Sequence, residues 1–130
     1  MQQSREGLVM LEAEQLTYTI RGCVYEVYRK LGCGFLEKVY ERAMLIELRL
    51  QGLQVESQVP IAVRYKGEVV GEYFADLIIN GSVILELKAQ QSILAAYEAQ
   101  LLNYLNATGM QLGLLVNFAF PKATIKRIVL

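Results

Sequence analysis

The chain has 130 residues, of which 54% are hydrophobic, and its 13 basic and 13 acidic side chains give a net charge of zero. This length corresponds to one ordinary domain with a core of its own, and the apolar content excludes a disordered protein. The absence of histidine excludes Ser-His-Asp and Cys-His catalysis, nucleases with a histidine base, and Cys/His zinc sites.

The chain lacks the signals that direct proteins to membranes or out of the cell. No apolar run approaches the roughly 20 residues that a membrane-spanning helix needs. The first ten residues lack the basic and then apolar layout of a signal peptide. We therefore expect a soluble, cytoplasmic protein with no membrane partner, in which Cys23 and Cys33 are reduced thiols.

The first half of the chain predicts a leader and two helices. Residues 1–11 are expected to form a flexible leader, and residues 12–130 a single domain. Apolar residues recur at intervals of three and four over 12–31 and again over 36–50, which predicts two amphipathic helices separated by glycines. The residues expected to face inward are Leu16, Ile20, Cys23, Val24, Val27, Tyr28 and Leu31 in the first helix, and Leu36, Val39, Tyr40, Ala43, Met44 and Leu48 in the second.

The second half changes to an alternation with a period of two, which predicts strands. Lys66-Gly67 and Asn80-Gly81 are turn signals that divide these strands into hairpins. The predicted strands cover 55–59 and 61–65 on either side of Pro60, then 69–79, 83–88, 111–118 and 124–130, with one helix over 93–107. This order predicts an α/β (α+β) domain with a mixed central sheet flanked by helices.

The second hairpin carries an acidic residue in each of its apolar strands. These residues are Asp76, which is the only aspartate in the chain, and Glu86, which is followed by Lys88 on the same face of its strand. An ionised carboxylate in such a segment is costly unless a partner or a metal compensates it. Carboxylates suit Mg²⁺, and a neighbouring lysine can stabilise negative charge on a phosphate, so the motif indicates metal-dependent hydrolysis. The alternative is an ion pair on the sheet surface.

The turn decides whether the two acids meet. A two-residue Asn80-Gly81 loop would place Asp76 opposite Leu85 and would leave Glu86 on the wrong face. One more loop residue, or a bulge, shifts the pairing by one position and brings both acids to the same face. Because a metal site would need both acids on the same face, we predict an odd-length loop or a bulge, with Gly81 at positive φ.

Two of the predicted helices carry polar pairs on one face. Glu37 lies in the first turn of the second helix with Tyr40 one turn further on, although an acid at a helix start also complements the helix dipole. Gln100 and Tyr104 share a face of the third helix at i and i+4, where a plain surface pair is the alternative.

Taken together, these motifs resemble the GxxExxY proteins, which belong to the RecB-like branch of the PD-(D/E)xK nuclease superfamily. The resemblance covers the chain from Leu16 to Leu130. Its motifs occur in order as Gly34-x-x-Glu37-x-x-Tyr40, Ala75-Asp76, Glu86-Leu87-Lys88-Ala89, Gln100-Leu-Leu-Asn-Tyr104 and Leu115-Val116-Asn117-Phe118. Two positions depart from the pattern: Ala75 stands in place of the proline that names the superfamily, and Ala119 stands where a glycine is expected.

The resemblance implies a restriction-endonuclease-like core and a Mg²⁺- or Mn²⁺-dependent nuclease that hydrolyses phosphodiester bonds; DNA is the expected substrate, and RNA is the alternative. Asp76 and Glu86 would bind the metal together with the backbone carbonyl of Leu87, and Glu37 would complete or orient the site. Lys88 would be the catalytic lysine.

The resemblance also assigns substrate contacts and leaves two other functions open. Tyr40, Gln100 and Tyr104 would contact the substrate, and the last two could instead support Lys88. The alternatives are a module that binds nucleic acid without cleaving it, and a homodimeric interaction module on the same fold. An unidentified protein partner would suit a domain too small to hold DNA alone.

Overall fold

The computed structural model describes residues 4–130. This part of the chain forms three helices and five strands. In chain order they are α1 (Arg5–Leu31), α2 (Glu37–Leu50), β1 (Val55–Tyr65), β2 (Glu68–Ile79), β3 (Val83–Lys88), α3 (Ala95–Thr108), β4 (Leu112–Phe118) and β5 (Ala123–Val129). None of the helices described has both the length and the apolar character required to cross a membrane.

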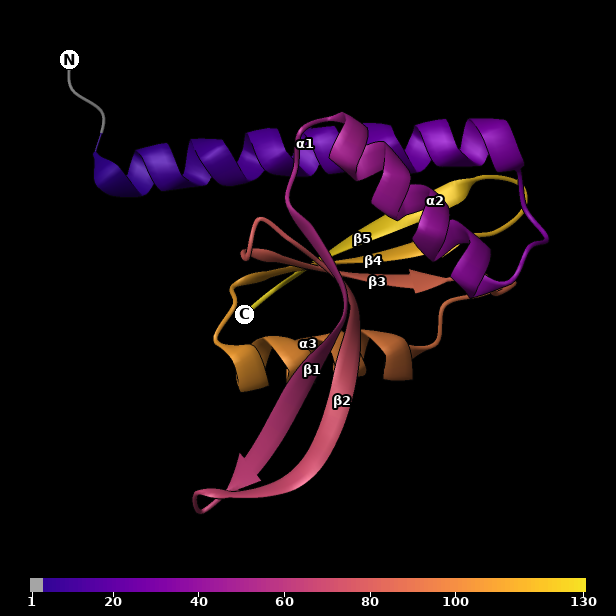
Figure 1. Ribbon diagram of the computed structural model, residues 1–130. Helices are drawn as coiled ribbons and strands as arrows, with labels where there is room; N and C mark the ends of the chain where they lie inside the picture. The colour runs from indigo at the N-terminus through magenta and orange to yellow at the C-terminus, as the bar shows by residue number, and fades with distance from the viewer. Residues whose placement is uncertain (1–3) are drawn as a thin grey trace.

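The five strands form one mixed sheet in the order β1-β2-β3-β4-β5. Only the β3–β4 pair is parallel, and the other neighbours are antiparallel. Helices α1 and α2 lie on one face of the sheet, and α3 lies on the other (Figure 1). Every residue of β4 is buried, as expected for a strand covered on both faces. The predicted fold class, a mixed sheet flanked by helices, is confirmed.

Helix α1 begins at Arg5, seven residues before the predicted start. Ser4 caps it, because its hydroxyl oxygen accepts a hydrogen bond of 3.0 Å from the Gly7 N–H. Residues 5–11 are therefore helical and do not form the flexible leader expected from the sequence, while residues 1–3 lie outside the described part. The predicted inward stripe is confirmed, since its central members, Ile20, Cys23, Val24 and Val27, are buried.

Helix α2 packs through a narrower stripe than the sequence predicts. Tyr40, Met44 and Leu48 are fully buried, as expected. Leu36 is 80% exposed, because it precedes the helix with extended backbone angles, and Val39 is also exposed. The expectation that these two side chains face inward was wrong.

The β1–β2 hairpin is longer and more continuous than predicted. Strand β1 passes through Pro60 without interruption, which is allowed because β1 is an edge strand and one side of it needs no N–H donors. The far end of the hairpin extends beyond the sheet and bends over α3 (Figure 1). The predicted turn at Lys66-Gly67 is confirmed, with both residues at positive φ.

The β2–β3 turn has the odd length required by the two acids. Ile79 pairs with Val83, so the loop contains three residues, and Gly81 has a φ of +62°. The pairing continues to Leu77 and Leu85. Asp76 and Glu86 are the next residues away from the turn, and the same register places them beside each other. The register predicted from the sequence is confirmed.

Candidate active site

The Asp76 and Glu86 carboxylates each accept a hydrogen bond from a backbone N–H of the neighbouring strand. The Asp76 N–H donates to Glu86 Oε1 at 3.0 Å, and the Leu87 N–H donates to Asp76 Oδ2 at 2.8 Å. Glu86 is only 5% exposed, and Asp76 is half-buried. The sheet therefore holds both carboxylates at defined positions, and each retains an oxygen that these two bonds do not use.

Burial and like charge make both acids harder to ionise. Burial raises the pKa of Asp76, and the charges of Glu41 and Glu37 raise it further, against the opposing effects of the Leu87 N–H and Lys88. Burial, followed by the charge of Asp76, raises the pKa of Glu86 to about 8. Two such acids side by side favour either a shared proton or a bound cation.

Lys88 lies two residues after Glu86 on the same face of β3, and its ammonium group contacts an aromatic ring. Its Nζ lies 4.4 Å from the centre of the Tyr97 ring on α3, within the range of a cation–π contact. The charge of Lys88 lowers the pKa of both Asp76 and Glu86. Sequence reasoning did not select Tyr97, because the contact depends on how α3 lies against the sheet.

Helix α2 brings two further carboxylates, those of Glu37 and Glu41, to a cavity that Asp76 also lines. Glu37, one of the site residues expected from the sequence, and Glu41 line this cavity of about 230 Å³ together with Asp76 and Leu87. Glu41 is buried and accepts hydrogen bonds from Lys38 Nζ at 3.0 Å and from Gln58 Nε2 at 2.8 Å.

The residues around this small cavity also link α2 to the strands. Gln58 Nε2 lies 3.4 Å from Asp76 Oδ1, and Gln90 Nε2 lies 3.4 Å from Glu37 Oε1. Sequence reasoning missed Glu41, although its position four residues after Glu37 on one helix face was a usable signal. It also missed Gln58, for which the sequence carries no such signal.

Tyr40 does not face the candidate site, contrary to its predicted contact with substrate. Its side chain is fully buried, and its ring stacks on Phe118 with centres 4.3 Å apart. The hydroxyl donates to the Gly32 carbonyl at 2.7 Å and accepts from the Phe35 N–H at 3.3 Å. Tyr40 therefore holds the loop that leads into α2, and through it the position of Glu37.

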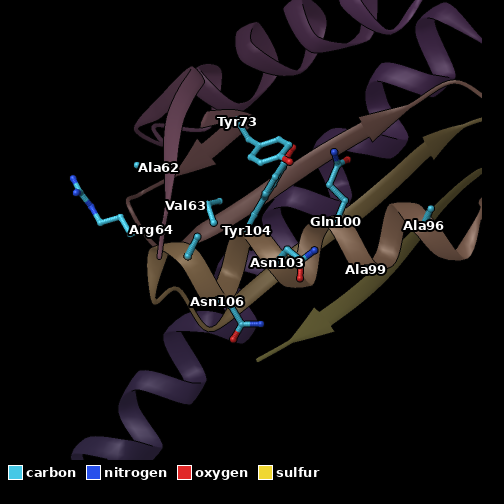
Figure 2. Close-up of a pocket in the computed structure, with 11 residues that line it drawn as sticks. Ala62, Val63, Arg64, Tyr73, Ala96, Ala99, Gln100, Asn103, Tyr104 and Asn106 are labelled. Carbon is cyan, nitrogen blue, oxygen red and sulfur yellow. The ribbon is translucent and has the colours of Figure 1, made fainter. Parts of the chain in front are cut away.

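Gln100 and Tyr104 line a second and larger hollow of about 900 Å³ between α3 and the β1–β2 hairpin (Figure 2). The Tyr104 ring is tilted against Tyr73, with centres 5.8 Å apart. Burial, followed by the charges of Glu86 and Asp76, raises the pKa of the Tyr104 hydroxyl to about 12. Tyr104 thus lines this hollow within electrostatic reach of the two acids.

The donor set around Asp76 suits a hard divalent cation. Within residues 4–130, no three Asp, Glu or Cys side chains are already arranged as a metal cage. Mg²⁺, however, commonly uses one or two carboxylates and fills its other positions with water. Asp76 and Glu86 supply two carboxylates whose ionisation is opposed by burial, and a cation would relieve that cost. The residues present therefore fit Mg²⁺ or Mn²⁺.

Comparison with known proteins agrees with this geometry. A family model described as the PD-(D/E)XK nuclease superfamily matches residues 14–128. The crystal structure of SSO0001 superposes with a TM-score of 0.58 at 20% identity, over 72% of this chain and 50% of that chain. The matched region is thus half the length of SSO0001, and at this identity the likeness concerns the fold alone. No curated protein is significantly similar to the chain.

Proposed function

The chain belongs to the PD-(D/E)XK nuclease superfamily, and from this premise we propose that it is a metal-dependent nuclease of the GxxExxY group. Asp76 and Glu86 are the metal carboxylates in this proposal, and Lys88 is the catalytic lysine. The observation that carries it is the three-residue β2–β3 turn, which sets the half-buried Asp76 and the buried Glu86 side by side, with Lys88 two residues further along β3.

The chain's own residues would divide the work of phosphodiester hydrolysis. Asp76, Glu86 and the Leu87 carbonyl would hold Mg²⁺ or Mn²⁺, which supplies Lewis acidity toward the phosphate. Lys88, held over the Tyr97 ring, donates hydrogen bonds to phosphate oxygens and stabilises their developing charge.

The α2 carboxylates complete the site from the other side. Glu41 is held between Lys38 and Gln58, and the same Gln58 amide approaches Asp76. Glu41 therefore orients Asp76 through Gln58, and Glu37 faces the same cavity from the first turn of α2. We assign both glutamates to positioning the acids and adding negative charge that favours a cation.

A cleavage assay tests this function directly. Labelled single-stranded, duplex and flapped DNA, and RNA, would be incubated with the full chain and Mg²⁺ or Mn²⁺. We expect Asp76→Asn and Lys88→Ala to lose roughly 100- to 1,000-fold of the rate, the usual cost of removing a group that stabilises transition-state charge. Circular dichroism would show whether both variants are folded.

Matched controls lie on exposed parts of α1. Glu12→Gln and Lys30→Ala remove an acid and a base that are exposed and far from β3 in the chain, so both should cut like the wild type. A wild type that is inactive on every substrate with both metals would refute the proposal. So would folded Asp76→Asn and Lys88→Ala proteins that cut at the wild-type rate.

The second candidate is a module that binds nucleic acid without cutting it. It is favoured by the large hollow beside α3, which offers a binding surface outside the acid cluster. Salt-dependent binding without metal-dependent cleavage would identify this function.

A further inference from the structure

The hollow beside α3 is an open groove with two different walls, and we call it the hairpin–α3 groove. The hairpin wall includes the Tyr73 ring, and the α3 wall carries several alanines together with the amides Asn103 and Asn106 (Figure 2). Its volume of about 900 Å³ is near the upper end of the roughly 300–1,000 Å³ typical of ligand pockets. The small alanine side chains leave this space open.

The groove carries almost no charge. Arg64 is the only charged residue among the described residues that line it. Its Nη1 donates to the Gly67 carbonyl at 3.3 Å, and the side chain extends away from Asn103 and Asn106 (Figure 2). Duplex binding depends on several Lys and Arg contacts to phosphates, which this groove does not offer.

The groove instead offers groups that suit unpaired bases. A tyrosine ring can stack on a base face, and amide side chains can hydrogen-bond base edges that pairing would otherwise occupy. Tyr73 is 47% exposed, and Asn103 and Asn106 are also exposed, so all three are accessible.

The groove adjoins the candidate active site along α3, because Lys88 Nζ lies over the Tyr97 ring and Gln100, one turn further along that helix, lines the groove. Tyr104 lines the groove, and the charges of Glu86 and Asp76 reach its hydroxyl. Asp76 also lines the small cavity that contains Glu37 and Glu41. A strand lying in the groove along α3 would therefore approach Lys88 and the two acids. Those acids repel phosphates, so its affinity must come mainly from base contacts.

We propose that the hairpin–α3 groove holds an unpaired nucleic-acid strand next to the bond to be cut, with Tyr73 stacking on a base and Asn103 and Asn106 contacting base edges. The position of the cut bond rests on the proposed nuclease function, whereas binding of the strand does not. DNA and RNA strands share this chemistry, and the test distinguishes them.

Binding without a metal separates the groove from catalysis. Fluorescence anisotropy of the full chain with labelled oligo-dT and oligo-rU would be measured in a chelator, with unlabelled duplex as competitor. We expect single strands to bind and duplex to compete only weakly. The logarithm of the binding constant should fall only slightly as the logarithm of the salt concentration rises. Its slope should be about −0.7 for each phosphate contact.

Two adjacent aromatic residues provide a matched pair of variants. Tyr73→Ser should weaken binding roughly 5- to 100-fold, which corresponds to the loss of one base–aromatic stack. Phe74 is the next residue of β2, with 49% exposure, but it does not line the groove, so Phe74→Ser should bind within twofold of the wild type. Asn103→Asp adds a negative charge and should also weaken binding.

The groove proposal is overturned if duplex competes as well as single strands, or if no single strand binds. It is also overturned if folded Tyr73→Ser and Asn103→Asp bind strands as tightly as Phe74→Ser does. Cleavage by the same proteins with Mg²⁺ tests the other proposal separately. Lys88→Ala should stop cutting, and in this background Tyr73→Ser should still weaken strand binding. If the wild type binds strands in a Tyr73-dependent way but never cuts them, the nuclease proposal is refuted and the groove proposal is supported.

Discussion

The acid cluster around Asp76 and the hairpin–α3 groove adjoin each other but follow opposite physical rules. The cluster is small and rich in charge, and hydrogen bonds from α2, β1, β2 and β3 tie its side chains together. The groove is several times larger and nearly neutral, and it lies between the hairpin and α3. A site that must hold a cation gains from buried acids at defined positions, whereas a surface that takes many base sequences gains from neutral and accessible groups.

This difference implies that chemistry and substrate binding can be changed separately. Changes to the cluster should alter stability and rate with little effect on strand affinity. Changes to the hairpin or α3 should alter affinity without disturbing the hydrogen bonds between β2 and β3. The following predictions test that separation, from the largest expected effect to the smallest.

The pH dependence of stability should expose the buried charge of the cluster. The pKa of Glu86 is about 8 in the folded chain against an ordinary value of 4.5, so between these values the folded state holds a proton that the unfolded chain has lost. The free energy of unfolding of the metal-free protein should therefore fall as pH rises through this window, by up to about 1.4 kcal/mol per pH unit.

Glu86→Gln should flatten this slope and should be more stable than the wild type at pH 8. Urea unfolding in a chelator between pH 5 and pH 8 would measure both effects. Strand binding should weaken slightly toward pH 8, because ionised Glu86 adds to the repulsion of phosphates, whereas the Tyr104 hydroxyl, with a pKa of about 12, keeps its proton. A slope that persists unchanged in Glu86→Gln would show that this carboxyl is not its source.

Replacing Glu41 should reduce the rate without reducing strand affinity. Glu41→Gln removes the charge that pairs with Lys38 and the acceptor that positions Gln58 beside Asp76. We expect cleavage to slow roughly 10- to 100-fold, as is typical when a group supporting a metal ligand is lost. Glu47→Gln on the same helix is the control and should keep the wild-type rate. An equal loss in both variants would indicate a general effect on α2.

Gly113→Ala should disturb the groove but not the cluster. A Cβ at this position would lie 2.8–3.0 Å from side-chain atoms of Leu101, so the Leu101 side chain must move, or α3 must shift with it. We expect a loss of about 1–3 kcal/mol in unfolding free energy, as for other overpacked cores, together with altered strand affinity.

Gly22→Ala is the matched control for that change. The added Cβ has no neighbour within 4 Å in the middle of α1, and alanine favours a helix by about 1 kcal/mol over glycine. This variant should therefore be slightly more stable than the wild type and should bind strands equally well. Gly113→Ala with unchanged stability would mean that α3 is not seated on β4 as described.

The smallest effect is expected from Tyr40→Phe. The change removes the two hydrogen bonds to Gly32 and Phe35 but keeps the stack on Phe118. Thermal unfolding should report a loss of about 1 kcal/mol, with strand affinity unchanged. A loss of affinity at full stability would instead restore the substrate contact that the sequence predicted for Tyr40.

Much of the fold could be predicted because its signals are local. Apolar periodicity located the helices and strands, and most errors lay at element ends, such as the start of α1 at Arg5 and the position of Leu36, while the break predicted at Pro60 lies inside β1. A helix end depends on a single cap such as Ser4, which carries a weaker signal than a repeated pattern.

The sequence by itself placed Lys88 on the same face as Glu86, because side chains alternate along a strand. It limited Asp76 to two registers, of which metal chemistry favours the one with both acids on the same face. The tertiary structure alone decided the contact of Tyr97 with Lys88, the burial of Tyr40 and the existence of the hairpin–α3 groove. These features depend on how helices seat across the sheet and how a long hairpin bends. Such geometry arises from packing between residues far apart in the chain, and no local pattern encodes it.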